Sequence, residues 1–444
     1  MLRLSRLCAA LTLVLPLSQA WALDLTQAYQ AALEQDASIK ASRAYADAGR
    51  ESVPQARAQL LPYVSASFSR NNNQLESTTP NILGQLSSSS YSYPSSNDTV
   101  TVRQPIYRSA QWAQYRQAQA QVVDVEAVLE NDLQNLAVKV GSAYFEALLA
   151  QDQLALNRSQ LAGFKAHLES ARKLLAAGSG TRTEVDEAQA RLDMGVAQEL
   201  ESLQNVDYTR QQLQVMVNQP LDALATLNAD RLNLSPPAPA SVEAWIRRAE
   251  ESSAELRALR ARVEAARQEV VKSRSGHYPT LDAVAQWSRS SSENSVSINS
   301  TYETRSLGVQ LTVPIYSGGG VNSSVRQALA NRERAEQILE AARRDLGVRV
   351  HKEYRGGAEG VLRVRALEQA VRSALLAQDS SRKSFEGGAR TRIDVLNAET
   401  AVVVATRDLA QARYVYLISQ LRLQALVSDA GLASIELANQ ALKP

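Results

Sequence analysis

Apolar residues recur along the chain with two periods, one typical of helices and one typical of strands. Residues 25–60 and 242–274 repeat them every three or four positions, which predicts two amphipathic helical segments. Pro54 is expected to kink or interrupt the first segment, because proline lacks the amide hydrogen that a helix interior needs. Pro62 and Pro279 are expected to end the two segments.

Each helical segment is followed by alternating apolar and polar residues, the period of a strand with one apolar face. A stretch rich in serine, asparagine and threonine comes next, and we interpret it as a solvated loop because it could not bury a core. A second alternating run then returns and ends at a proline. The expected strands cover residues 64–68, 100–102, 281–287 and 307–313, and the expected loops cover residues 71–97 and 288–301. Each half of the chain is thus predicted to place a β-hairpin between helices.

The helix after each hairpin is predicted to be very long. Residues 109–177 contain no proline, and at 1.5 Å per residue they would extend for about 100 Å. This helix is expected to end at Gly178, and a new one to run from about Thr183 to Val217. The second half repeats the plan over residues 320–386 and restarts near Thr391. Helical hairpins of this length are expected to pack as coiled coils.

These repetitions indicate an internal duplication. Gln104-Pro105-Ile106-Tyr107 returns as Val313-Pro314-Ile315-Tyr316, 209 positions later, and Gly178 returns as Gly388, 210 positions later. We predict five parts: a signal peptide at 1–22, a first repeat at 23–218, a linker at 219–240, a second repeat at 241–427 and a C-terminal tail at 428–444. Pro236 to Pro239 make the linker stiff.

The first 22 residues have the order of a secretory signal. Arg3 and Arg6 precede an apolar run, and Ala20-Trp21-Ala22 supplies the small residues of a cleavage site. The only cysteine, Cys8, falls inside this segment, so the mature protein is expected to lack disulfides and thiolate chemistry. The net charge of +2 over 444 residues makes nucleic acid an unlikely partner.

Four strands with one apolar face cannot close a barrel alone, and an open sheet edge in a bilayer leaves backbone groups without partners. Oligomerisation would resolve this. Three chains would supply twelve strands and two would supply eight, and both numbers are known for closed barrels. Strand counting therefore leaves the number of chains open.

The duplicated order of motifs resembles the TolC-type outer-membrane efflux protein family. The residues that carry the resemblance are Gln104 to Tyr107, Val313 to Gly319, Gly276 to Leu281, Gly388 to Ala398 and Ala412 to Leu417. The resemblance implies an α+β membrane protein, mostly α. It would form a homotrimeric duct, with a 12-stranded outer-membrane β-barrel continued by a periplasmic α-helical barrel. The implied partners are a periplasmic adaptor (membrane fusion) protein and an inner-membrane ABC or RND-type transporter, for type I secretion or multidrug efflux.

The resemblance also implies a periplasmic gate at the ends of the helical hairpins. Gly178, Gly180, Gly387 and Gly388 would form the tips to which the adaptor docks, Asp394 and Asn397 would line the gate, and Arg390, Thr183, Glu184 and Phe385 would hold it closed. The family places a second acid where Asn397 stands and a tyrosine where Phe385 stands, so this chain would carry one acidic ring. Asp394 is also explained by the preference of helix N-termini for acids, without any gate.

Nothing in the sequence predicts catalysis, a cofactor or a metal site. His167, His277 and His351 lack the spacing of metal ligands, which favours solvated or core roles, and no nucleophile motif is present. Gly356, Gly357 and Gly360 lie inside a predicted helix, where we expect a kink or a packing adjustment. The alternative function is a structural coiled-coil protein of the envelope without a channel. The four strands discriminate between the two, because a purely helical protein does not need them.

Overall fold

The computed structural model describes residues 22–221, 223–292 and 300–443. The predicted signal peptide therefore lies outside the described residues, apart from Ala22. The helices are α1 (Leu25–Gln35), α2 (Ala37–Arg50), α3 (Ser52–Ala58), α4 (Ser109–Ala176), α5 (Arg182–Val217), α6 (Val242–Ser252), α7 (Ala254–Arg274), α8 (Gly320–Glu386), α9 (Arg392–Leu426) and α10 (Leu432–Asn439). The strands are β1 (Tyr63–Pro80), β2 (Leu86–Tyr107), β3 (Thr280–Ser292) and β4 (Ser300–Thr312).

The chain folds into two compact units, and each takes segments from both sequence repeats. The hairpin unit comprises Met1–Ala37, Leu133–Trp245 and His351–Pro444. The sheet unit comprises Ser38–Asp132 and Ile246–Val350. The long helices α4 and α8 contribute to both units.

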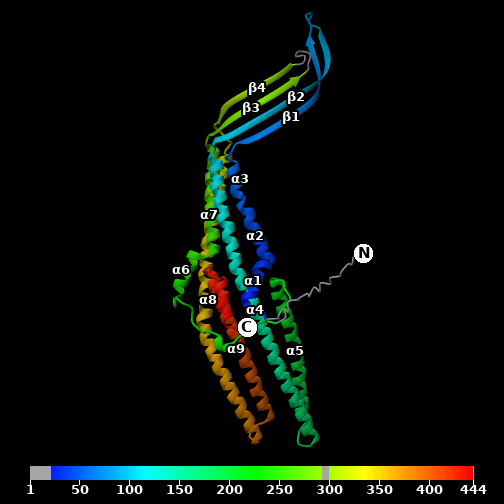
Figure 1. The fold of residues 1–444 in the computed structure, drawn as a ribbon, viewed down its shortest axis with the longest axis vertical. Coiled ribbons are helices and arrows are strands. Elements are labelled where there is room, and N and C mark those ends of the chain that lie inside the picture. The colour runs from blue at the N-terminus through cyan, green and yellow to red at the C-terminus, as the bar shows by residue number, and fades with distance from the viewer. Residues whose placement is uncertain (1–21, 222, 293–299, 444) are drawn as a thin grey trace, which may run out of the picture. The chain divides into compact units, whose positions relative to one another are not determined.

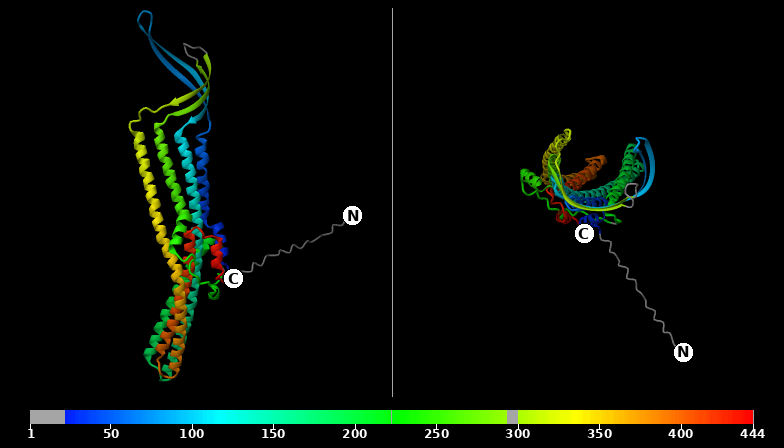
Figure 2. Two further views of the ribbon diagram at one scale, coloured as in Figure 1. Left: turned by 90° about the vertical axis from the view of Figure 1, so that its left-hand side faces the viewer. Right: turned by 90° about the horizontal axis from the view of Figure 1, so that it is seen from above.

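In the sheet unit, the four strands form one antiparallel sheet in the order β1-β2-β3-β4. Each strand joins a helix in sequence, so α3, α4, α7 and α8 follow the same order beneath the sheet (Figure 2). Ion pairs connect neighbouring helices: Arg50 with Glu126 at 3.1 Å, Arg262 with Asp124 at 2.9 Å and Arg343 with Glu250 at 3.0 Å. The unit is thus a layer of four strands continued by a layer of helices.

The predicted solvated loops are wrong for most of their length. β1 and β2 pair continuously from Tyr63↔Arg103 to Pro80↔Leu86, so the Ser/Asn-rich residues lie in strands. A ladder needs backbone hydrogen bonds and not apolar side chains, and polar side chains add their own cross-strand bonds, such as Asn73 to Ser95 at 2.8 Å. The turn itself is short and uses Gly84 at a φ of 74°. Of the second expected loop, residues 293–299 lie outside the described residues and the remainder belongs to β3 and β4.

The first helical segment of each repeat is divided into shorter helices. The spacing of apolar residues gave no sign of these breaks. Asp36 separates α1 from α2, and Ser253 separates α6 from α7. In both cases one residue leaves the helix, which is too short an interruption to disturb a period of 3.6. The interruption expected at Pro54 is found three residues earlier, at Glu51, so that Pro54 lies in the first turn of α3, where no amide hydrogen is required.

In the hairpin unit, the four predicted long helices are confirmed to within two residues. Figure 1 shows α4 with α5 and α8 with α9 as two helical hairpins. Asn157 on α4 donates to Ser202 on α5 at 2.6 Å, and Arg413 on α9 donates to Glu368 on α8 at 2.8 Å. The hairpins meet where the Tyr414 hydroxyl donates to Asp152 at 2.7 Å, next to the Phe145 ring.

The predicted linker lies against the hairpin unit. Tyr416 on α9 donates from its hydroxyl to the Ser235 carbonyl at 2.8 Å. A Cβ on Gly357 would lie only 2.8 Å from Pro237 Cγ, and one on Gly360 would lie 3.2 Å from the Tyr416 ring. A kink or a packing adjustment was expected at these glycines. The structure has the packing adjustment, and α8 is one continuous helix.

Candidate functional site: the hairpin ends and the apolar sheet face

The two helical hairpins end in nearly identical turns. Gly178 and Gly388 take φ values of 75° and 76°, a conformation that glycine adopts without steric cost. Three positions later in each repeat a threonine starts the next helix: Thr181 caps α5 and Thr391 caps α9. The duplication seen in the sequence thus extends to the geometry of the turns.

Both acidic residues predicted at these ends complete a capping box. The Glu184 carboxylate accepts from the Thr181 amide at 2.9 Å, and the Asp394 carboxylate accepts from the Thr391 amide at 2.9 Å and hydroxyl at 2.8 Å. The hydrogen bonds from Thr391 lower the pKa of Asp394 below its ordinary value. Asp394 is therefore ionised at neutral pH. Asn397, one turn further along α9, is exposed.

The residues expected to hold the gate lie close to the two hairpin turns. Arg390 lies 3.4 Å from Ser381 of the preceding helix, and among the described residues no hydrogen bond joins it to Glu184. The Phe385 ring faces the guanidinium of Arg392, whose carbon is 5.4 Å from the ring centroid. Thr183 is exposed.

Two contacts join the hairpins near their ends, and sequence reasoning missed both. Arg392 on α9 donates to Ser170 on α4 at 2.6 Å, and His167 on α4 lies 3.2 Å from the Glu399 carboxylate on α9. They border a small pocket of about 170 Å³ between the hairpins. The sequence separations of 222 and 232 residues explain why no local pattern could reveal these pairs.

One face of the sheet is apolar and exposed. Directly paired residues share a face, and the register places Val64, Val102, Ala285 and Leu307 in one row across the four strands. Leu307 is 86% exposed, and Phe68 of the same face is 70% exposed. Exposed apolar surface of this extent marks an interaction with lipid or with another protein.

The other face of the sheet is polar. Gln310 pairs with Asp282, which is buried and accepts a bidentate ion pair from Arg108 at 2.8 and 2.5 Å. Val309 and Leu311 lie on the apolar face, as their register with Ala283 and Leu281 requires. The strand register expected from the alternation is confirmed.

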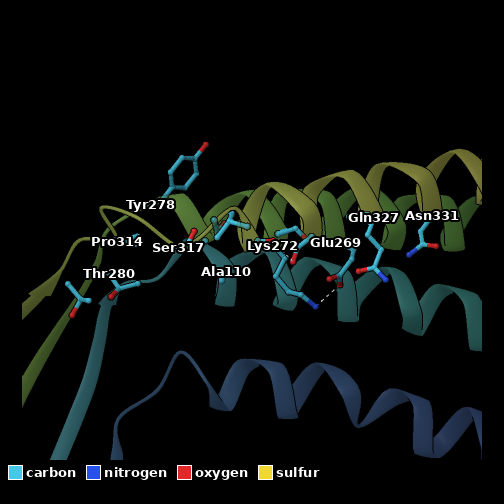
Figure 3. A pocket seen from close by; sticks show the side chains of 17 residues that line it. Ala110, Glu269, Lys272, Tyr278, Thr280, Pro314, Ser317, Gln327 and Asn331 are labelled. Atoms are coloured by element: carbon cyan, nitrogen blue, oxygen red, sulfur yellow. Dashed lines mark hydrogen bonds and ion pairs between the residues drawn. The ribbon is translucent and has the colours of Figure 1, made fainter.

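The largest cavity described in the sheet unit lies where the sheet joins the helices (Figure 3). It has a volume of about 780 Å³ and a lining that includes Tyr278, Gln327 and Asn331. Its charged groups satisfy each other, because Lys272 forms an ion pair with Glu269 at 2.5 Å. The lining offers no pairing of a nucleophile with a base, as catalysis would require.

Neither a metal nor a membrane-spanning helix is indicated. Within residues 22–221, 223–292 and 300–443, no three His, Cys, Asp or Glu side chains are grouped as a metal would need. No helix in the same ranges combines the length and the apolar character needed to cross a membrane.

Comparison with known proteins identifies the type of molecule to which these features belong. The family model described as "Outer membrane efflux protein" matches residues 28–219 and 245–428, one stretch in each repeat. The chain belongs to the outer membrane efflux protein family. Alkaline protease secretion protein AprF of Pseudomonas aeruginosa is 34% identical, covering 96% of this chain and 88% of that protein. Proteases secretion protein PrtF of Dickeya chrysanthemi is 33% identical, covering 94% and 91%.

Solved structures of outer-membrane channels have the same fold. The outer-membrane channel OprN aligns with a TM-score of 0.78 at 16% identity, covering 92% of this chain and 90% of that one. The CmeC channel of Campylobacter jejuni aligns with a TM-score of 0.80 at 14% identity, covering 94% and 90%. The chain is thus an export channel of the outer membrane, its helical part lies in the periplasm, and it is not an enzyme. A structural coiled-coil protein without a channel is not favoured.

Proposed function

We propose that three copies of this chain assemble into one channel that carries a protein through the outer membrane by type I secretion. The observation that carries the proposal is the open sheet. β1 and β4 are edge strands, and the apolar face beside them is exposed. In a bilayer such edges must be paired, which β4 of one chain and β1 of the next can do.

The number three rests on the family, since two or three chains would both give a permitted number of strands. Native mass spectrometry of the protein in detergent measures this number directly. A trimer supports the proposal, and a monomer or dimer that persists at every concentration contradicts it.

The choice of a protein as cargo rests on the relatives named for secretion. AprF and PrtF are named for protease secretion and match over nearly the whole of this chain. The transporter that supplies the cargo is then of the ABC type, joined to the hairpin ends by an adaptor.

Secretion tests the cargo. The chain is expressed in a bacterium that lacks its own export channel, together with the transporter and adaptor encoded beside this chain and their candidate cargo protein. Appearance of the cargo in the medium only when this chain is present supports the proposal. Cargo that stays in the cell while resistance to small toxic compounds returns would indicate efflux of small molecules.

We further propose that the hairpin ends form the gate and the adaptor contact. Asp394 and Asn397 lie one helical turn apart at the start of α9, so both can face one axis in a symmetric assembly. The turns that an adaptor would meet first contain Gly178, Gly387 and Gly388, which are exposed, and Gly180, which is half-buried. Arg390, Thr183, Glu184 and Phe385 lie within a few residues of the same turns and hold the closed state.

A further inference from the structure

A set of charged residues borders the apolar face of the sheet at the end away from the helices. The register places Asp98, Arg289 and Glu303 in one row across β2, β3 and β4. Arg305 pairs with Trp287 one row nearer the helices, and Arg70 lies on the same face of β1, two positions beyond Phe68. We call these five charged residues the charged border. They are Arg70, Asp98, Arg289, Glu303 and Arg305.

The charged border is positively charged, and two of its three arginines are held in place by hydrogen bonds. Arg70 donates to Asp98 at 2.5 and 3.3 Å, and Arg305 donates to Glu303 at 2.7 Å. Arg289 stands opposite both Asp98 and Glu303. Three guanidinium groups face two carboxylates, so each chain keeps one net positive charge in this border. Arg305 is 80% exposed and Arg70 is 63% exposed, so both keep donors free for a ligand.

The border also marks a level in the membrane. Toward the helices the same face is mainly apolar, with rows such as Val64 to Leu307 and with Gln104 beside Ala283, whereas beyond the border it carries Asn72 and Gln74. The indole of Trp287 lies at the boundary and donates to Glu303 at 3.0 Å. Arginine is costly on a lipid-facing surface at the midplane and tolerated at the headgroup level, where tryptophan also concentrates. Because the helices lie in the periplasm, this level belongs to the outer leaflet.

We propose that the charged border binds the phosphate groups of phosphorylated glycolipids in the outer leaflet. Guanidinium groups match phosphate with two parallel hydrogen bonds, and they do so best when they are already oriented. Asp98 and Glu303 supply that orientation, and Arg289 between them is the central donor. The lipid chains then lie along the exposed apolar rows. The proposal depends on the outer-membrane location and is independent of the cargo and of the gate.

Reconstitution tests the proposal with the full chain. Vesicles of phosphatidylcholine are prepared with lipid A or with lipid A from which the phosphates have been removed, and native mass spectrometry counts the lipids retained by each assembly. Wild type should retain lipid A that carries its phosphates. It should not retain lipid A from which the phosphates have been removed. The double variant R289Q/R305Q should bind lipid A at least about tenfold more weakly, since each bond to a charged group contributes strongly.

Arg103→Gln is the matched control. Arg103 is exposed and lies on β2, but it pairs with Val284 and therefore occupies the opposite face. The variant removes one positive charge, as R289Q alone does, and should retain lipid A as wild type does. The proposal is overturned if R289Q/R305Q keeps the preference of wild type, or if wild type does not distinguish the two lipids. The same spectra report the number of chains, so a failure to assemble is distinguished from a loss of lipid. If the double variant does not assemble, R289Q alone is measured by the same criterion.

Discussion

Arg392 joins the two helical hairpins, because its guanidinium donates to Ser170 Oγ at 2.6 Å while lying 5.4 Å from the centre of the Phe385 ring. Arg390, which was expected to hold the gate, lies beside Ser381 of its own hairpin. Within one chain, the contact between the hairpins near their ends therefore depends on Arg392, and on the neighbouring pair of His167 with Glu399.

Arg392→Ala is expected to loosen the closed state. It removes a hydrogen bond from a charged donor, which shifts the equilibrium toward the open channel by about tenfold. Single-channel recording in planar bilayers should show a higher open probability. Ser170→Ala should act in the same direction and add little in the double variant, whereas purely additive effects would show that the two residues act separately. Arg390→Ser, which leaves this contact in place, tests the proposed role of Arg390 separately.

Asp394→Asn should lower the preference of the channel for cations. In a symmetric assembly the Asp394 carboxylates gather around one axis, and a ring of acids attracts cations. Asn397→Asp should raise the preference by adding a second ring. Reversal potentials across a salt gradient measure both effects. An unchanged selectivity in Asp394→Asn would leave the carboxylate with only the helix-capping role seen in its bonds to Thr391.

The long helices and the strand register could be predicted from the sequence because each depends on a local period. Ser109–Ala176 could be predicted as one helix because it contains no proline. The alternation around Val309 shows which face of the strand is apolar. The contacts near the hairpin ends could not be predicted in this way. Arg390 and Arg392 are two positions apart in one turn, and only the packing of α9 against α4 decides which of them reaches the other hairpin. The Ser-rich strands were missed because they pair through backbone hydrogen bonds. Every sequence carries these backbone groups, so the pattern of apolar side chains does not reveal the pairing.

The two faces of β4 should tolerate charge unequally. Leu311→Arg places a charge on the apolar face and should cost about 2 to 4 kcal/mol near the midplane of the bilayer. Gln310→Arg places the same charge on the polar face, beside Asp282, and should be tolerated. The fraction of assembled protein in outer-membrane extracts measures the difference. Equal assembly of the two variants would be incompatible with the register.

Gly360 should resist enlargement because α8 and α9 pack closely there. A Cβ at this position would lie 3.2 Å from the ring of Tyr416, and a leucine would extend well past that distance. Gly360→Leu is expected to destabilise the hairpin unit by about 1 to 3 kcal/mol through overpacking. Gly347→Leu, at a position in α8 with nothing within 4 Å, is the control in thermal unfolding. A similar loss of stability in both variants would mean that replacing the glycine backbone causes the loss, and not packing against Tyr416.

Asp152 should make stability fall as the pH rises. Burial raises the pKa of this carboxyl, although the hydrogen bond from Tyr414 lowers it in part. A group whose pKa is higher in the folded state than in the unfolded state binds more protons when folded. Its contribution is thus complete below about pH 4, the ordinary pKa of an aspartate, and is lost as the pH rises through the folded value. Asp152→Asn keeps an acceptor for Tyr414 without the ionisation.

Thermal unfolding in detergent at a series of pH values from about 2 to about 8 measures this effect. The midpoint of wild type should fall with pH relative to that of Asp152→Asn. Glu340→Gln is a control of opposite sign, because hydrogen bonds from Arg343 and Arg344 lower the pKa of Glu340 to about 2. Its stabilisation is present above the ordinary pKa of a glutamate and is lost as the pH falls toward 2. Parallel curves for wild type and Asp152→Asn would mean that the pKa of Asp152 is the same in the folded and unfolded states, so that its burial has no consequence for the pH dependence of stability.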